Sequence, residues 1–250
     1  MALSFFLNLV LGHLIGDFVL QPYWLVVAKR SGWLGLFIHV GVVTFITAIL
    51  VWASIPVWWM WIVILYIGHL FIDQFRTFVF TDNTNGKGLL LLVLDQVAHI
   101  VLIAVLAWAA TGWRFSDLQL LFTDSASSRY QLIAYLSGLA ILIGVVPILE
   151  VEITVAVWAT QGHQVGHTVS IETSDRILGS LERIVAMFLI LTGYGLISPL
   201  IFVPRLAYMI YRGQAKVNRT AVICKVITSF ASTIIVSAVL YFVPFPGVIL

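Results

Sequence analysis

The chain has 250 residues, of which 61% are hydrophobic and only 10% are charged, with a formal net charge of +2 and a mean hydropathy of +1.07. A soluble domain carries roughly a quarter charged residues, so this composition excludes a soluble globular protein and indicates a membrane protein. The small net charge gives no reason to expect a nucleic-acid partner. The single cysteine, Cys224, excludes an internal disulfide and a thiolate metal cluster.

Apolar segments long enough to cross a bilayer recur along the whole chain. A spanning helix needs roughly 20 mostly apolar residues. By this rule the sequence predicts an all-α, polytopic transmembrane helix bundle with about seven spans, and six to eight spans fit the pattern. The predicted spans cover residues 3–27, 34–52, 58–80, 89–110, 130–158, 184–204 and 221–243.

The two halves of the chain are predicted to differ in organisation. Residues 1–110 form a four-helix membrane core, in which the first four spans are two repeated hairpins. Residues 111–250 supply the remaining membrane helices and a polar loop at 160–183. The fifth span, at 130–158, is expected to tilt or break near Pro147.

Lysine and arginine in short loops bear on orientation, but here they disagree. The basic residues between the last two predicted spans favour a cytoplasmic N-terminus. Lys29, Arg30 and Lys87 would then lie outside, which favours the opposite orientation. The sequence therefore leaves both orientations open.

A short motif occurs twice in the N-terminal half. Gly-His-Leu begins at Gly12 and again at Gly68, 56 residues later, and in each copy an aspartate follows the histidine at i+4. The interval holds one helical hairpin, so His39 and Asp95, each 26 residues after the repeated histidine, take equivalent positions. Repeated hairpins commonly place a site at the repeat interface, although a match this short also fits chance.

Histidine and aspartate side chains from these spans are predicted to converge. His13, Asp17 and Gln21 follow one another at i, i+4 and i+8, so on a helix they share one face. Positions equally far from the turn at 81–88 lie at equal depth in an antiparallel hairpin, which levels residue 73 with 95 and residue 69 with 99. The spacing predicts two layers one helical turn apart, about 6 Å. One layer contains Asp17, Asp73 and Asp95, with His39 close to it, and the other layer contains His13, His69 and His99.

Carboxylates at this depth need a compensating positive charge. One aspartate near the centre of a membrane helix costs roughly 2.5–3.5 kcal/mol, and several would repel one another. Imidazoles combined with carboxylates suit Zn²⁺, Mn²⁺ or Fe²⁺, as one ion or as two with shared carboxylates. The sequence thus predicts a divalent metal ion held by His13, Asp17, His39, His69, Asp73, Asp95 and His99.

Neighbouring residues are predicted to support this site. Gln21 is expected to orient a ligand or contact substrate, and Gln96, next to Asp95, to hydrogen-bond to the ligands. Arg76, one turn beyond the second repeated aspartate, either forms an ion pair or binds an anionic headgroup or phosphate. Gly12 and Gly16 have the small-xxx-small spacing that lets a neighbouring helix approach closely.

Charged residues of the C-terminal half are predicted to form ion pairs at the membrane interface. Glu182 and Arg183 open the sixth predicted span, and Arg183 is a candidate partner of Glu150. His163 and His167 fall at i, i+4 in the polar loop, where solvated side chains and a surface metal site are both compatible with the pattern.

Three functions fit these observations. The first is a metal-dependent hydrolase acting on a lipid or lipid-linked substrate, with Asp17, Asp73, Asp95 and Arg76 as catalytic residues. The second is a divalent-cation or proton-coupled transporter, since a proton relay uses the same residues without metal. The third is a non-catalytic membrane scaffold, in which each His/Asp pair is a hydrogen bond between helix neighbours.

The motifs resemble those of the bacterial multi-pass membrane proteins called domain of unknown function 3307. The matching segments are 13–21, His39, 69–73, 95–99 and 179–183, with a looser match at 215–229. The resemblance spans nearly the whole chain and is specific in the first half. It implies an integral protein of the bacterial inner membrane, surrounded by membrane lipids, and it implies no established activity.

Overall fold

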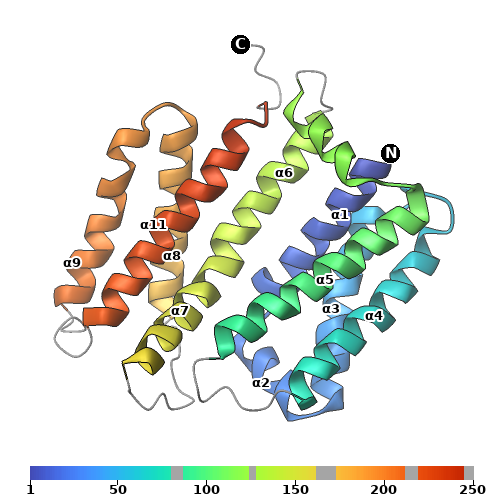
Figure 1. Cartoon of the computed structure of the whole chain (residues 1–250), viewed down its shortest axis with the longest axis horizontal. Helices are drawn as coiled ribbons and strands as arrows, with labels where there is room; N and C mark the ends of the chain where they lie inside the picture. The colour runs from blue at the N-terminus through green and yellow to red at the C-terminus, as the bar shows by residue number, and fades with distance from the viewer. Residues whose placement is uncertain (80–86, 124–127, 162–172, 212–218, 245–250) are drawn as a thin grey trace. The chain divides into compact units, whose positions relative to one another are not determined.

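The computed structural model describes residues 1–79, 87–123, 128–161, 173–211 and 219–244, and in these ranges the chain forms helices and no strand (Figure 1). The predicted all-α fold is confirmed. Among the described residues, six helical segments are long and apolar enough to cross a membrane, which is the lower end of the predicted range. They are Ala2–Val19, Trp33–Val51, Trp58–Arg76, Gly88–Thr111, Ser128–Thr160 and Arg219–Tyr241.

The chain divides into two compact units. The first comprises Met1–Thr81, Leu91–Ala140 and Val243–Leu250, so it includes a segment beyond the boundary predicted at residue 110. Its elements are α1 (Ala2–Leu14), the π-helical turn η1 (Ile15–Val19), α2 (Tyr23–Ser31), α3 (Trp33–Val51), α4 (Trp58–Val79), most of α5 (Gly88–Thr111), the 3₁₀ helix η2 (Phe115–Phe122) and α6 (Ser128–Ala140).

Helix α3 is central to the first unit because it packs against α1, α2 and α4 (Figure 1). Two glycines of the first span make the closest of these contacts. A Cβ atom on Gly12 would lie 2.7 Å from the Cα of Thr47, and one on Gly16 would lie 2.6 Å from the Cα of Val43. The close helix approach predicted from the glycine spacing is therefore confirmed.

The first predicted span, 3–27, ends earlier than expected. The helix stops at Val19, and Pro22 then precedes the separate short helix α2. Proline lacks an N–H group and its ring clashes with the preceding turn, so the first helix does not continue through residue 22. Helix α2 instead lies on the start of α3, where a Cβ on Gly35 would come within 2.7 Å of the main-chain nitrogen of Lys29.

Helices α4 and α5 expose most of their apolar surface. Only 17% of the spanning window of α4 and 28% of that of α5 is buried within the protein. Large side chains such as Phe71 and Val97 are exposed on them. In a membrane these faces contact lipid, because such extended apolar surfaces are rare on soluble monomers.

The second unit comprises Asp82–Leu90 and Ile141–Phe242. Its elements are the π-helical turn η3 (Ile141–Val145), α7 (Val146–Thr160), α8 (Thr173–Leu191), the 3₁₀ helix η4 (Gly195–Phe202), α9 (Val203–Tyr211) and α11 (Arg219–Tyr241). Helix α11 packs against α7 and α8, and α8 packs against η4.

Three segments here differ from the sequence-based expectation. Residues 184–204 do not form one helix, because α8 ends at Leu191 and Gly193 takes a φ of +88° that favours glycine. Helix α8 also begins at Thr173, so part of the predicted 160–183 loop is helical. Of the tilt or break predicted near Pro147, the break is absent: helical structure is continuous from Ser128 to Thr160, and the π-helical turn η3 lies directly before the residue pair that contains the proline.

Some sequence-based predictions concern residues outside the described ranges. These are most of the turn at 81–88, the loop histidines His163 and His167, and the basic segment 212–218.

Candidate metal centre

Four histidines and three aspartates converge inside the first unit, and each residue is at most 6% exposed. We call them the His/Asp cluster. They come from α1 and η1, α3, α4 and α5, so the convergence that the sequence spacing predicted is present. The members are His13, Asp17, His39, His69, Asp73, Asp95 and His99.

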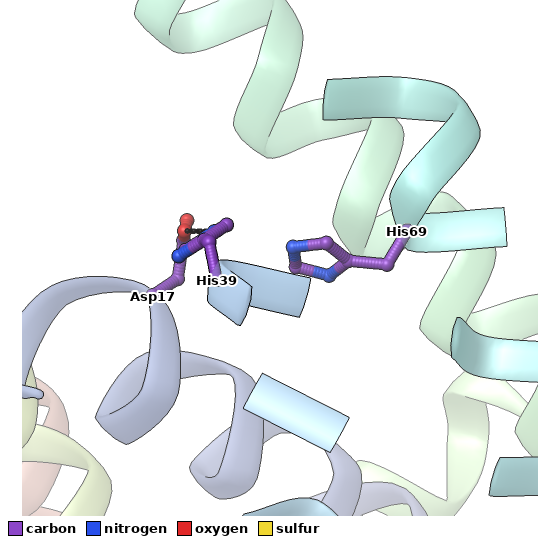
Figure 2. A group of neighbouring side chains, drawn as sticks. All are labelled: Asp17, His39 and His69. Atoms are coloured by element: carbon purple, nitrogen blue, oxygen red, sulfur yellow. Dashed lines mark ion pairs between the residues drawn. The ribbon is translucent and has the colours of Figure 1, made fainter. Parts of the chain in front are cut away.

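The carboxylates of two different helical segments meet at one imidazole. His39 Nε2 lies 3.0 Å from Asp17 Oδ1 and 3.1 Å from Asp73 Oδ2. Figure 2 shows the ring of His69 projecting from α4 toward the pair formed by Asp17 and His39. Asp17 belongs to the π-helical turn η1, and such widened turns occur frequently at functional sites.

A second group of ligand atoms shares a histidine with the first. His69 Nε2 lies 3.4 Å from Asp73 Oδ2, and the His69 and His99 ring centroids are 4.2 Å apart. Two triads can each present ligand atoms within 4.8 Å of one another. The triads are Asp17, His39 and His69, and His69, Asp73 and His99.

The spacing of these atoms fits a bound divalent ion. Zinc binds nitrogen and oxygen at about 2.0–2.2 Å, so two tetrahedral ligands lie roughly 3.3 Å apart. Within the part of the chain that the structure describes, six side-chain atoms of the His/Asp cluster have no hydrogen-bond partner. Four of them belong to the triads: Asp17 Oδ1, Asp73 Oδ2, His69 Nε2 and His99 Nε2. Since buried polar atoms are nearly always paired, a cation held between them would supply the missing interaction.

Gln21 orients the imidazole of His39. With its amide oxygen facing the ring, Gln21 accepts a hydrogen bond from His39 Nδ1 at 3.0 Å, while its amide nitrogen donates to the main-chain oxygen of Asp17 at 2.9 Å. A neutral histidine that donates from Nδ1 presents a lone pair at Nε2, the atom facing the two carboxylates. Metal-binding histidines commonly have such a second hydrogen bond.

Gln96 connects the remaining two members to the cluster. Its amide nitrogen donates to Asp17 Oδ2 at 3.2 Å and to Asp95 Oδ2 at 3.0 Å, and its oxygen accepts from His13 Nε2 at 3.2 Å. His13 and Asp95 belong to neither triad. The structure therefore brings all seven predicted ligands together. His13 and Asp95, however, are joined to Asp17 through the side-chain amide of Gln96.

Arg76 pairs with Asp95 rather than with its helix neighbour Asp73. Arg76 Nη1 lies 2.8 Å from Asp95 Oδ2, which is the ion-pair alternative of the two roles predicted for it. His99 Nδ1 donates to the main-chain oxygen of Asp95 at 2.9 Å, so the Nε2 of His99 is left for the cluster.

Lys29 is a member of the site that sequence reasoning missed, because it was assigned to the connection after the first span. Its Nζ lies 3.5 Å from His39 Nε2, 3.9 Å from Asp17 Oδ1 and 4.0 Å from Asp73 Oδ2. The sequence contains one signal for this position: after Pro22, Leu25 and Lys29 stand at i, i+4 and so share one face of a helix. In the structure both residues are buried on α2.

If all four imidazoles are neutral, the charges of the site do not sum to zero. Asp17, Asp73 and Asp95 contribute three negative charges, and Lys29 and Arg76 contribute two positive ones. With neutral imidazoles the sum is −1, and the deficit lies at the carboxylates of Asp17 and Asp73, because Arg76 is paired with Asp95.

A separate buried cluster of charges lies in the second unit. The predicted pair of Arg183 and Glu150 is confirmed, with Arg183 Nη1 at 2.7 Å from Glu150 Oε1. The pair is buried rather than exposed at an interface. Ion pairs connect the wider network, which contains Glu150, Asp175, Glu182, Arg183, Arg205 and Lys225. Three basic groups inside it make it an unsuitable site for a metal cation.

Residues 5–127 match the family model described as "Protein of unknown function (DUF3307)". The resemblance inferred from the sequence motifs is thus confirmed for the N-terminal half, and the matched range contains the whole His/Asp cluster together with Lys29 and Arg76. The segment 179–183 lies outside it. Neither a curated protein nor a solved structure matches the chain.

Proposed function

We propose that the DUF3307 domain of this chain binds a divalent metal ion within the membrane and hydrolyses an ester or phosphoester of a lipid or lipid-linked molecule. The observation that carries this proposal is the convergence, at the spacing of metal ligands, of imidazole nitrogens and carboxylate oxygens that have no hydrogen-bond partner. The donor set of nitrogen and oxygen suits Zn²⁺, Mn²⁺ or Fe²⁺.

The ligands of such an ion would be the members of the two triads. Asp17, His39, Asp73 and His69 form an unbroken series in which neighbouring ligand atoms are 3.0–3.4 Å apart. His99 extends the series and allows a second ion with His69 or the Asp73 carboxylate as the shared ligand. His13 and Asp95 would then act through Gln96, by holding its amide against Asp17.

A bound divalent ion would supply Lewis acidity, which lowers the pKa of water and polarises a carbonyl or phosphoryl oxygen. The residues around it would divide the remaining work. Carboxylate oxygens not used as ligands would accept the proton of the attacking water. Arg76, whose side chain is 24% exposed while its Nη1 contacts Asp95, would bind negative charge that develops on the substrate.

The position of the cluster favours a lipid substrate. Its ligands lie on four apolar spanning segments, two of which, α4 and α5, expose most of their surface. A membrane lipid can approach these helices without leaving the bilayer. The resemblance to bacterial multi-pass proteins makes the bacterial inner membrane the proposed location, with lipids as the partners of the outer faces.

Metal content of the purified protein tests the metal site directly. The native protein should retain about one or two equivalents of metal by plasma mass spectrometry after extensive dialysis. His39→Ala combined with His69→Ala should lose it, whereas His163→Ala combined with His167→Ala removes two imidazoles from another part of the sequence and should leave it. Equal metal content in all three proteins would exclude the proposed centre.

Hydrolysis needs a second measurement. Mixed micelles containing a phospholipid ester or a lipid phosphomonoester should release free fatty acid or inorganic phosphate in a metal-dependent way. Arg76→Gln should lower kcat while metal content stays unchanged. Stoichiometric metal without any turnover of either lipid class would argue against a hydrolase and leave the metal site standing.

A divalent-cation transporter is the second candidate, and Lys29 is the observation that favours it. Its ammonium group lies within 4.0 Å of two candidate ligand carboxylates, so the site has an internal cation that can alternate with an external one. Gradient-driven uptake of Mn²⁺ or Zn²⁺ into liposomes would support transport, and tight stoichiometric metal without flux would support the enzyme.

A further inference from the structure

Lys29 is the only lysine or arginine among the described residues that forms ion pairs with both triad carboxylates. Its Nζ is nearly equidistant from Asp17 Oδ1 and Asp73 Oδ2, at 3.9 and 4.0 Å. It also lies 3.5 Å from His39 Nε2, which is the same atom that both carboxylates approach. The ammonium group therefore faces the ligand atoms that a metal ion would use.

The fold holds Lys29 in this place. Pro22 ends the first helix and starts α2, which returns the chain to the cluster, and Leu25 is buried on the same face of α2 as Lys29. Gly35 lets the start of α3 contact the α2 backbone at Lys29. The amide oxygen of Gln21 also accepts a hydrogen bond from Lys29 Nζ at 3.0 Å. A side chain with four flexible methylene groups is thereby directed at one point.

The net charge at Asp17 and Asp73 depends on whether Lys29, a divalent ion or both are present. Asp17 and Asp73 together carry −2, and the ammonium of Lys29 reduces the sum to −1. A divalent ion would bring the same pair to 0 if Lys29 withdrew, but to +1 if Lys29 stayed. Because like charges repel strongly when water is excluded, the ammonium and the metal oppose each other at these carboxylates.

We propose that Lys29 is a tethered cation that competes with the divalent metal for Asp17 and Asp73, and so sets the metal affinity of the site. This inference rests on the proposed metal centre. In the metal-free protein Lys29 stabilises the two carboxylates, and metal binding displaces its ammonium group. Gln21 provides one alternative contact for the displaced side chain, because its amide oxygen already accepts from Lys29 Nζ.

The test compares Lys29→Met with the native protein. Methionine keeps most of the apolar length and removes the charge. Zn²⁺ and Mn²⁺ affinities of chelator-stripped protein, measured by competition with a chelating dye, should be about tenfold or more tighter in Lys29→Met. Arg30→Met removes a charge from the exposed face of the same helix and should change the affinity by less than about twofold. Lys29→Arg, which keeps the charge, should not tighten binding.

Thermal unfolding separates competition from a purely structural role. Without metal, Lys29→Met should unfold at a lower temperature than the native protein, and saturating metal should raise its Tm more than it raises the native one. If Lys29 had only a structural role, Lys29→Met would lower the Tm by the same amount with and without metal. Unchanged or weaker metal binding in Lys29→Met would overturn the competition while leaving the native metal site intact. No metal binding by any of the proteins would overturn the proposed function together with this inference.

Discussion

Arg183 donates a hydrogen bond from Nη1 to Glu150 Oε1 across 2.7 Å, and both side chains are buried in the second unit. The other oxygen of Glu150 accepts from Arg205 Nη2 at 2.8 Å, so one carboxylate serves two guanidinium groups. Arg183 also donates from Nε to the main-chain oxygen of Leu142, which ties α8 to the π-helical turn η3. The pair thus connects three elements of this unit.

Arg183→Met should destabilise the protein severely. Removing one partner from a buried ion pair leaves an uncompensated charge, and such changes cost about 3–5 kcal/mol. The measurement is thermal or denaturant unfolding in detergent. Arg129→Met at the exposed start of α6 is the matched control and should shift the unfolding free energy by less than about 1 kcal/mol. Equal shifts in the two variants would show that the buried network adds nothing to stability.

The stability of the second unit should fall as pH rises, because of Glu182. Both carboxyl oxygens of Glu182 are buried, and Arg205 Nη1 is 3.9 Å from Oε2. Burial raises the pKa of Glu182 from 4.5 to about 7. Between pH 4.5 and about pH 7 the folded protein keeps a proton on Glu182 that the unfolded chain loses. The free energy of unfolding therefore decreases as the pH rises through this range.

Glu182→Gln isolates this effect, since the amide mimics the neutral acid. The variant should have a higher Tm than the native protein at about pH 8 and nearly the same Tm at about pH 5. The charged groups near Glu182, which are Arg183, Arg205, Glu150 and Asp175, are common to both proteins. A difference in Tm that is constant across this range would refute the assignment.

Helix periodicity and equal distance from a turn were enough to predict six members of the His/Asp cluster, whereas His39 was placed by the sequence repeat and by its position at the start of the second span. Pairs at i, i+4 fix a shared face within a helix, and equal distances from a turn fix equal depth between two helices. Both relations depend only on regular helix geometry, and the ring contacts of His69 with His13 and His99 agree with them. The sequence could not predict that five residues form the triads while His13 and Asp95 contact Gln96 instead. That arrangement depends on the rotamer of Gln96 and on which helices approach most closely.

Sequence reasoning failed where the chain leaves regular geometry. The apolar run through residue 27 hid the end of the first helix before Pro22, and Lys29 therefore appeared to lie outside the core. In the second unit, polarity suggested a surface loop for residues that form α8. Their charges are buried because Asp175 and Glu182 face Arg205 from another helix, a pairing that no local pattern reveals.

Gly12→Ala should separate α1 from α3 and weaken the metal site. The added methyl group would lie 2.7 Å from the Cα of Thr47, so backbone has to move and carries His13 and Asp17 with it. Gly41→Ala is the matched control on α3, because a Cβ there meets nothing within 4 Å. We expect a lower Tm and lower metal content for Gly12→Ala, and a Tm equal to or slightly above native for the control. Similar losses in both variants would indicate a general intolerance of alanine rather than a close helix contact.

Gln96→Leu should weaken metal binding without removing a ligand. Its amide nitrogen donates to Asp17 and Asp95, and its oxygen accepts from His13. Leucine of similar size removes these hydrogen bonds, so Asp17 and His13 become free to reorient, while Asp95 keeps its ion pair with Arg76. Loss of a residue that orients metal ligands typically costs 10–100-fold in metal affinity. Gln131→Leu, which replaces a buried glutamine of α6, should leave the affinity within about twofold of native, since the ligands have their hydrogen bonds and ion pairs with other residues. If the two variants lost affinity equally, the effect would come from general destabilisation of the first unit, and Gln96 would have no specific part in holding Asp17 toward the metal.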